Sequence, residues 1–146
     1  MSFVLTEDQE MLRDTAINFT RDELPVKHLR GLRDSGKNGV DPEGRQKLAE
    51  LGFFGVLIPE EYDGVGMGMV ALGQVMEAQG RTLASTPLLQ TACIGASAIL
   101  LGGSEAQKQE WLPKIASGEV TTALALDEGS HHNPAAMSWA SQLSGE

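Results

Sequence analysis

The sequence is poor in cysteine and in basic residues, and each shortage excludes a class of protein. Cys93 is the only cysteine, so no internal disulfide can form, and a reducing, cytoplasmic setting fits best. Eleven Lys and Arg residues stand against twenty Asp and Glu residues, which gives a net charge of −9 over 146 residues. Because such a chain repels a phosphate backbone, nucleic acid is not an expected partner.

The sequence also lacks an apolar run long enough to cross a membrane. The longest stretch that is nearly free of polar groups, Ala92 to Leu101, has about half of the roughly 20 residues that a membrane-spanning helix needs. The residues from Met1 to Glu7 have neither the basic region nor the apolar region of a secretory signal. With 41% apolar residues, the chain can bury one core, so we expect one compact domain plus a short remainder.

A capping box marks the first predicted helix. The Thr6 hydroxyl and the Gln9 amide are spaced to satisfy the free amides at a helix start, which predicts a helix over about residues 7–23. Pro25 lies just past its end as a stop signal. The segment from Lys27 to Gly39 is basic, polar and interrupted by glycine, so it predicts a loop with at most one helical turn.

Two further helices and a buried connection follow. Asp41 and Pro42 supply an N-cap and a first-turn proline, and Gly52 suits the end of this short second helix. The compact apolar run from Phe53 to Pro59 predicts an extended connection buried between helices. Apolar residues at helical spacing predict a third helix from about Met69 to Gly80.

The last two predicted helices differ in how much apolar surface they carry. The fourth, from Leu88 to Leu101, is apolar around most of its surface, so we expect it at the centre of a bundle. Ser104 and Gln107 repeat the capping-box spacing and start a fifth helix, in which Pro113 marks a break and Gly118 an end.

The pattern changes after the fifth helix. Residues from Thr121 to Leu126 predict a strand, and the loop that follows has no helical periodicity. The predicted fold class is therefore an all-α bundle over residues 1–119, with a short β stub that begins a second domain over residues 120–146. About 25 residues cannot enclose a core of their own, so we expect this second domain to be interrupted at Glu146.

Several segments in a fixed order resemble the acyl-CoA dehydrogenase family, over nearly the whole chain. The segments that carry the resemblance are Leu5-Thr6-Glu7-Asp8-Gln9, Leu48-Ala49-Glu50-Leu51-Gly52-Phe53-Phe54-Gly55-Val56, Ile58-Pro59-Glu60-Glu61-Tyr62, Gly64-Val65-Gly66-Met67-Gly68, Gly103-Ser104-Glu105-Ala106-Gln107-Lys108 and Trp111-Leu112-Pro113-Lys114-Ile115-Ala116-Ser117-Gly118-Glu119. Any one of these segments is weak alone. Their order and spacing over more than a hundred residues make chance agreement improbable.

The resemblance implies a flavoprotein of lipid metabolism with an N-terminal helical domain, a middle β-domain and a C-terminal helical domain, assembled as a homotetramer or a related heteromer. Such an enzyme oxidises an acyl-CoA thioester to the trans-2-enoyl-CoA with FAD, and an electron-transfer flavoprotein or similar acceptor takes the electrons. The family's catalytic base is a glutamate that the C-terminal domain usually supplies. No residue of this chain is therefore assigned as the base, and we expect the isolated chain to be inactive.

The same resemblance implies positions for both ligands. Leu124 and Leu126 would offer backbone groups to the flavin, and Asp127 stands where the family often has a flavin-contacting threonine. An ionised Asp only accepts hydrogen bonds, whereas a threonine hydroxyl also donates, so the usual contact would be lost or reversed. Ser130 would lie near the acyl-CoA entrance. Gln90 and Ile94, on the fourth helix, would face the acyl chain, although such an apolar helix is by default part of the core.

Three alternatives compete with these interpretations. The pattern Gly64-x-Gly66-x-Gly68 suggests either a phosphate loop or a flexible connection, and its spacing favours the connection. The pair His131-His132, with Asp127 and Glu128 nearby, matches the spacing of no standard metal site, so no metal is predicted. For the whole chain, the competing hypothesis is a noncatalytic helical module for binding or assembly, derived from the same family. The length of the reading frame beyond residue 146 would distinguish these two hypotheses.

Overall fold

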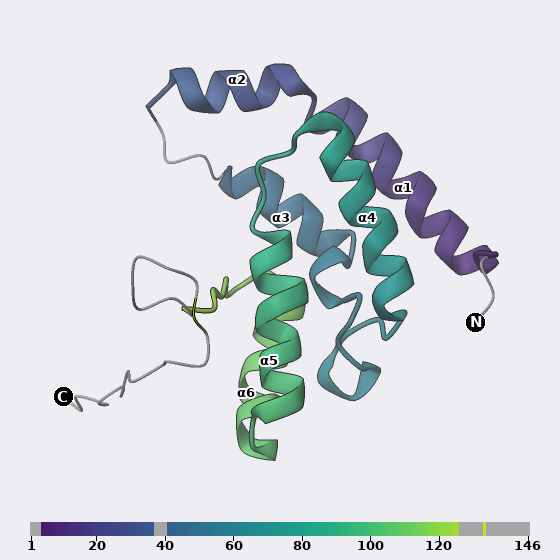
Figure 1. Ribbon diagram of the computed structural model, residues 1–146, viewed down its shortest axis with the longest axis vertical. Coiled ribbons are helices and arrows are strands. Elements are labelled where there is room, and N and C mark those ends of the chain that lie inside the picture. The colour runs from purple at the N-terminus through teal and green to yellow at the C-terminus, as the bar shows by residue number, and fades with distance from the viewer. Residues whose placement is uncertain (1–3, 37–40, 126–132, 134–146) are drawn as a thin grey trace.

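The computed structural model describes residues 4–36, 41–125 and 133, and within these residues the protein is helical with no strand (Figure 1). Its longer helices are α1 (Glu7–Glu23), α2 (Val26–Asp34), α3 (Pro42–Glu50), α4 (Gly68–Thr82), α5 (Ala96–Gly102) and α6 (Glu105–Ala116). Two 3₁₀ turns, η1 (Phe53–Gly55) and η2 (Glu60–Tyr62), and a π-helix, η3 (Leu89–Gly95), complete the described elements. The predicted all-α class is confirmed.

Helices α1 and α4 lie side by side and, together with η1, enclose the larger of two cores (Figure 1). Small side chains let the two helices approach, because Ala16 of α1 and Ala71 and Ala78 of α4 are all buried. The rings of Phe19 and Phe53 meet edge to face, with their centroids 6.3 Å apart. This core therefore joins α1 to a turn that follows α3.

A second, smaller core lies between η2, α5 and α6. Its buried members are Ile58, Tyr62, Ala96, Leu112, Ile115 and Ala116. The Tyr62 hydroxyl donates a hydrogen bond of 2.6 Å to Oε1 of Glu105, which ties η2 to the first turn of α6. This bond fixes the start of α6, whose outer side forms one wall of a cavity described below.

Both predicted capping boxes are present. Gln9 N–H donates to the Thr6 hydroxyl over 3.3 Å, and Thr6 N–H donates to the Gln9 amide oxygen over 3.1 Å. Ser104 and Gln107 repeat the arrangement, with donor–acceptor distances of 2.8 and 3.3 Å. The first helix covers residues 7–23 as predicted, because its cap satisfies two amides that otherwise lack partners.

The predicted loop from Lys27 to Gly39 is wrong, since residues 26–34 form α2. No residue of α2 is buried, so its side chains form no apolar pattern that would indicate a core-facing helix. A residue outside α2 contacts this helix, because Nε2 of His28 in α2 lies 3.0 Å from Oδ2 of Asp41 at the start of α3. A contact across thirteen residues of sequence separation is invisible to local periodicity.

Two other local predictions are also wrong. The apolar run from Phe53 to Pro59 begins with the 3₁₀ turn η1 instead of an extended chain, because Gly52 has a φ of +74° and turns the backbone at the end of α3. Pro113 does not break the last helix. It lies within α6, which continues to Ala116 because the neighbouring Leu112 and Ile115 are fully buried.

The fourth predicted helix is present, but only part of it is central. It comprises η3 and α5, and its buried residues lie mainly on one side, whereas Leu89 is 42% exposed and Leu101 is 89% exposed. The third predicted helix is α4 and extends by a residue or two at each end. The predicted strand is not shown, because residues 121–125 form no regular element and Leu126 lies outside the described residues.

The glycine-rich segment from Gly64 to Gly68 is a connection with no free amides. Its five backbone N–H groups all donate to carbonyl oxygens of Gly55, Val56, Ile58 and Pro59 over 2.9 to 3.3 Å. A phosphate loop needs amides that point at the ligand, so that interpretation is wrong. Gly64 has a steric role instead, because a Cβ atom there would overlap the Ile58 carbonyl oxygen.

We predict that Gly64→Ala destabilises the protein by at least about 2 kcal/mol, because the new methyl group meets rigid backbone. Gly73→Ala is the matched control. No atom lies within 4 Å of a Cβ atom at Gly73 in α4, so this change should stabilise by about 0.5–1 kcal/mol. Urea denaturation of both variants measures the difference. Equal stability of the two variants would refute the packing argument.

The Tyr62–Glu105 bond predicts a dependence of stability on pH. The hydrogen bond from the Tyr62 hydroxyl to the Glu105 carboxylate, together with burial, raises the pKa of Tyr62 from 10.0 to about 12. A group with a raised folded pKa contributes fully below its unfolded pKa and loses that contribution as pH rises through the folded pKa. The stability advantage of the wild type over Tyr62→Phe should therefore be constant below pH 10 and shrink between pH 10 and about 12. If the difference in unfolding free energy between the wild type and Tyr62→Phe stayed constant from pH 10 to about 12, this prediction would be wrong.

Candidate functional site

The first feature of the site is the π-helix η3, which continues without interruption into α5. Its wide turn is defined by the Ala96 N–H, which donates to the carbonyl of Thr91 five residues earlier. Turns of this kind are rare and occur often at functional sites, because they cost hydrogen-bond geometry that packing must offset. Thr91, Ala92 and Gly95 are buried, so η3 is anchored on one side.

A cavity of about 270 Å³ lies between the last turns of α4 and the start of η3. The residues that line it are Met76, Gln79, Gly80, Leu83, Ala84, Thr86, Leu89 and Gln90. Gln90, one of the two residues that the resemblance places at the acyl chain, lines this cavity with an exposed side chain. Ile94 lies four residues further along η3, half-buried, and does not line this cavity.

Gln79 also lines this cavity, although no sequence motif pointed to it. It is only 8% exposed, and its Oε1 accepts a hydrogen bond of 2.7 Å from the Thr86 hydroxyl. Its Nε2 is buried and has no hydrogen-bond partner among the described residues. The sequence did contain a signal for this position, because Gln79 continues the helical spacing of the apolar residues Leu72 and Met76. A polar side chain on the apolar side of a helix is buried and needs a hydrogen-bond partner.

The backbone at the end of α4 shapes the same cavity. Leu83 has a φ of +54°, a left-handed conformation that is uncommon for a residue other than glycine. This turn ends α4 and lets the Ala84 N–H donate to the Gln79 carbonyl over 3.0 Å. The chain then leads directly to Thr86, whose hydroxyl orients the Gln79 side chain.

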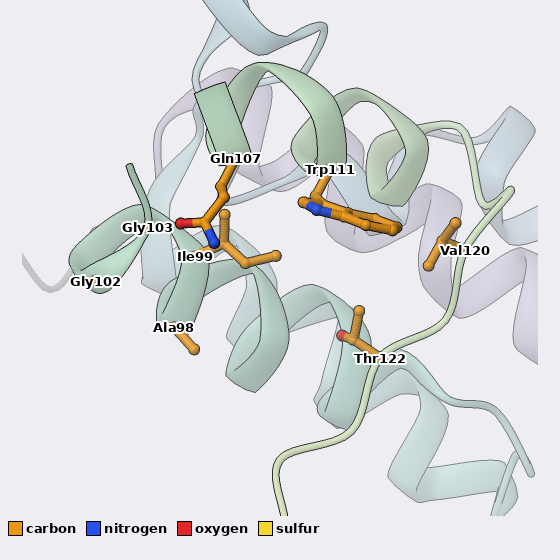
Figure 2. A pocket seen from close by; sticks show the side chains of 8 residues that line it. All are labelled: Ala98, Ile99, Gly102, Gly103, Gln107, Trp111, Val120 and Thr122. Atoms are coloured by element: carbon orange, nitrogen blue, oxygen red, sulfur yellow. The ribbon is translucent and has the colours of Figure 1, made fainter. Parts of the chain in front are cut away.

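A second, larger cavity of about 510 Å³ lies between α5, α6 and the segment that follows α6 (Figure 2). Its lining residues are Ala98, Ile99, Gly102, Gly103, Gln107, Trp111, Val120 and Thr122. Figure 2 shows the Trp111 indole projecting from α6 toward Val120, with Ile99 on the facing helix. The Lys114 ammonium lies 4.8 Å from the centre of the Trp111 ring, so it stacks on the indole.

The segment after α6 is tied to the π-helix. The Thr122 N–H donates to the hydroxyl of Thr91 over 3.2 Å, and this hydroxyl donates to the Thr122 carbonyl over 3.4 Å. Gly95 permits the approach, because a Cβ atom there would overlap the Thr122 hydroxyl. Residues 120–122 therefore run directly over η3, and the predicted flavin positions come next in the chain.

Of the predicted flavin positions, only Leu124 lies within the described residues. Its side chain is 53% exposed, and its backbone makes no hydrogen bond to any other described residue. Among the described residues, its backbone amide and carbonyl therefore have no partner. Leu126, Asp127 and Ser130 lie outside the described residues, as does the pair His131-His132.

Comparison with known proteins decides the family. Residues 6–119 match the family model described as Acyl-CoA dehydrogenase, N-terminal domain. The chain belongs to the acyl-CoA dehydrogenase family. As in the resemblance, the match begins at the first capping box and ends just after α6.

Individual relatives agree with this result. The (2S)-methylsuccinyl-CoA dehydrogenase of Cereibacter sphaeroides is 39% identical over 127 residues, which cover 85% of this chain and 22% of that protein. An acyl-CoA dehydrogenase complexed with FAD from Bacillus anthracis is 28% identical, with a TM-score of 0.72, over 84% of this chain and 21% of that one. The ChsE4-ChsE5 complex from Mycobacterium tuberculosis is 28% identical, with a TM-score of 0.80, over 91% of this chain and 36% of that one.

The chain thus spans between about a fifth and just over a third of the length of these relatives. The acyl-CoA dehydrogenase N-terminal domain accounts for α1 to α6. Within the part of the chain that the structure describes, no helix combines the length and the apolar character that a membrane crossing requires.

We predict that Thr91→Val destabilises the protein by about 1–3 kcal/mol, because it leaves the Thr122 N–H and carbonyl without their partner. Hydrogen exchange of the Thr122 amide should also become faster. The matched control is Thr15→Val, since the exposed Thr15 hydroxyl bonds only the carbonyl of Met11 in its own helix. Equal losses of stability in the two variants would show that the hydrogen bonds between Thr91 and Thr122 contribute nothing.

Proposed function

We propose that this chain forms the helical wall of the acyl-CoA site in a flavin-dependent acyl-CoA dehydrogenase. The observation that carries the proposal is the cavity between α4 and η3, which lies beside a π-helix within a domain of this family. The reaction is oxidation of an acyl-CoA thioester to the trans-2-enoyl-CoA, with removal of the α-proton by a carboxylate. When bound, FAD supplies the oxidant that accepts the β-hydrogen as hydride.

In this proposal, residues of η3 and α4 bind and orient the acyl chain. Gln90 lies at the cavity between them, and the half-buried Ile94 extends the apolar side of η3 toward the thioester. An apolar slot excludes water, which strengthens the hydrogen bonds that hold the thioester and protects the reacting atoms. The FAD complex of the Bacillus anthracis relative supports a flavin in this protein.

Leu124, Leu126 and Asp127 are the residues that we propose beside the flavin, and Ser130 near the acyl-CoA entrance. The free backbone of Leu124 supports this placement. The tether between Thr91 and Thr122 adds support, because it would bring the flavin segment and the acyl slot onto the same π-helix. The division into a helical domain over residues 1–119 and a following domain from residue 120 belongs to the same proposal, and the family match over residues 6–119 supports it.

The catalytic base is assigned to no residue of this chain. Neither of the two cavities described above is lined by an Asp or a Glu. We therefore propose that the 146-residue chain alone does not turn over acyl-CoA. Assembly with further copies or with a related chain, and an electron-transfer flavoprotein as acceptor, complete the proposal. The two-component nature of the Mycobacterium tuberculosis relative is consistent with such assembly.

The test is a titration of the ¹⁵N-labelled chain with octanoyl-CoA and with free CoA. We expect octanoyl-CoA, but not CoA, to shift the amides of Leu89–Gly95 and of the last turns of α4. Leu89→Gln should weaken octanoyl-CoA binding by about tenfold, because Leu89 lines the cavity and the apolar contact of one aliphatic side chain corresponds to about 1.5 kcal/mol.

Ile99→Gln is the control for this titration, because it makes the same aliphatic-to-amide change in α5 but at a residue that lines the other cavity. It should leave octanoyl-CoA binding unchanged. Shifts confined to the cavity around Trp111, or equal weakening by the two variants, would refute the proposed acyl slot. Turnover by the chain with an artificial electron acceptor would refute the assignment of the base to a residue outside it.

A further inference from the structure

We propose that Gln79 makes the acyl slot selective for acyl groups that carry a neutral oxygen acceptor, such as a keto oxygen, in their distal part. This inference rests on the proposed function, since it concerns the same cavity between α4 and η3. It adds a class of substrate to that function. The residue that specifies this class would be a single buried amide.

The side-chain amide of Gln79 has a hydrogen-bond donor that no described residue uses. Gln79 is more than nine-tenths buried, lines the cavity, and has an Nε2 without a hydrogen-bond partner among the described residues. A buried polar group without a partner is rare, because desolvation of the amide is not repaid. Gln79 lines the cavity while its Nε2 is covered, so a ligand reaches this donor only if the amide turns toward the cavity.

The Gln79 amide is oriented by a hydrogen bond. The Thr86 hydroxyl donates to Oε1 of Gln79 over 2.7 Å, so the oxygen is occupied and the nitrogen remains available. The left-handed turn at Leu83 places Thr86 there, because it reverses the chain at the end of α4. Once this amide turns toward the cavity, a ligand there meets a hydrogen-bond donor. A group that only donates would find no acceptor on this amide.

The cavity lining also restricts the charge of the ligand. None of the residues that line the cavity is Lys, Arg or His, and the chain carries a net charge of −9. The nearest arginine along α4, Arg81, bonds Glu77 over 2.6 Å and lines a different cavity with it. A carboxylate would lose its hydration without gaining a cation, whereas a neutral carbonyl loses much less. The geometry therefore favours a neutral oxygen.

The rest of the lining combines apolar walls from Met76, Leu83 and Leu89 with the exposed amide of Gln90. A mostly apolar pocket with a few well-placed polar groups binds apolar ligands in general and selects among them by those groups. An unsubstituted acyl chain would fit the walls but would leave Nε2 of Gln79 unpaired. An oxygen-bearing chain of the same length satisfies it.

The experiment compares three acyl-CoA probes of equal chain length across a series of lengths. The probes are an unsubstituted acyl-CoA, the corresponding methyl ketone, and the corresponding dicarboxylic monothioester. Binding to the 146-residue chain is measured by calorimetry and by NMR of the Gln side-chain amides. At the length that fits best, the ketone should bind about tenfold more tightly than the unsubstituted chain, which corresponds to about 1.4 kcal/mol. The side-chain amide signal of Gln79 should shift only with the ketone.

Gln79→Met tests the donor, because it keeps the length of the side chain and removes the amide. The preference for the ketone should disappear, and binding of the unsubstituted acyl-CoA should stay the same or improve. Gln74→Met is the matched control on α4, since Gln74 lines the cavity shared by Arg13 and Arg81. It should leave the preference intact.

The outcomes separate this inference from the function on which it rests. If no probe binds between α4 and η3, the proposed acyl slot is wrong. If all probes bind there equally, or if the preference survives Gln79→Met, the slot stands and the role of Gln79 is refuted. A preference for the dicarboxylic probe would overturn the argument from charge. Should an alcohol of the same length bind better than the ketone, Gln79 presents its oxygen to the ligand, and the orientation argued above is wrong.

Discussion

The burial of the chain from Phe53 to Ile58 is the constraint on which the other parts of the structure depend. Phe53, Phe54 and Val56 belong to the core between α1 and α4, whereas Ile58 belongs to the core between η2, α5 and α6. One short segment therefore joins both cores. It can do so only because its backbone groups are paired with the glycine-rich segment after η2, where Gly64 leaves room for the Ile58 carbonyl.

The candidate site uses those parts of the fold that are least regular. The π-helix η3, the left-handed Leu83 and the Nε2 of Gln79, which has no partner among the described residues, each cost stability relative to an ordinary helix and a satisfied core. The rigid cores on either side can hold these features in place. Natural proteins tolerate such costs where a ligand uses them, and here all three border one cavity or its adjoining helix.

The sequence predicted the helices whose signals are local, and it failed where the signals are not. The capping boxes at Thr6 and Ser104 located two helix starts correctly, because the bonds they make span three residues. Helix α2 was missed because its contact partner, Asp41, lies beyond the next turn of the chain. At the site, Gln90 lines the cavity between α4 and η3 and Ile94 does not, whereas no sequence motif selected Gln79.

The sequence by itself determined the all-α class, the absence of an internal disulfide and the membership of an enzyme family, because composition, local capping and an ordered set of motifs are properties of the linear chain. Only the tertiary structure decided which polar groups find partners. Whether Nε2 of Gln79 is free depends on Thr86, whose position depends on a turn at Leu83 and on the packing of η3 against α4. Hydrogen-bond satisfaction is a property of three-dimensional neighbours, so no local pattern encodes it.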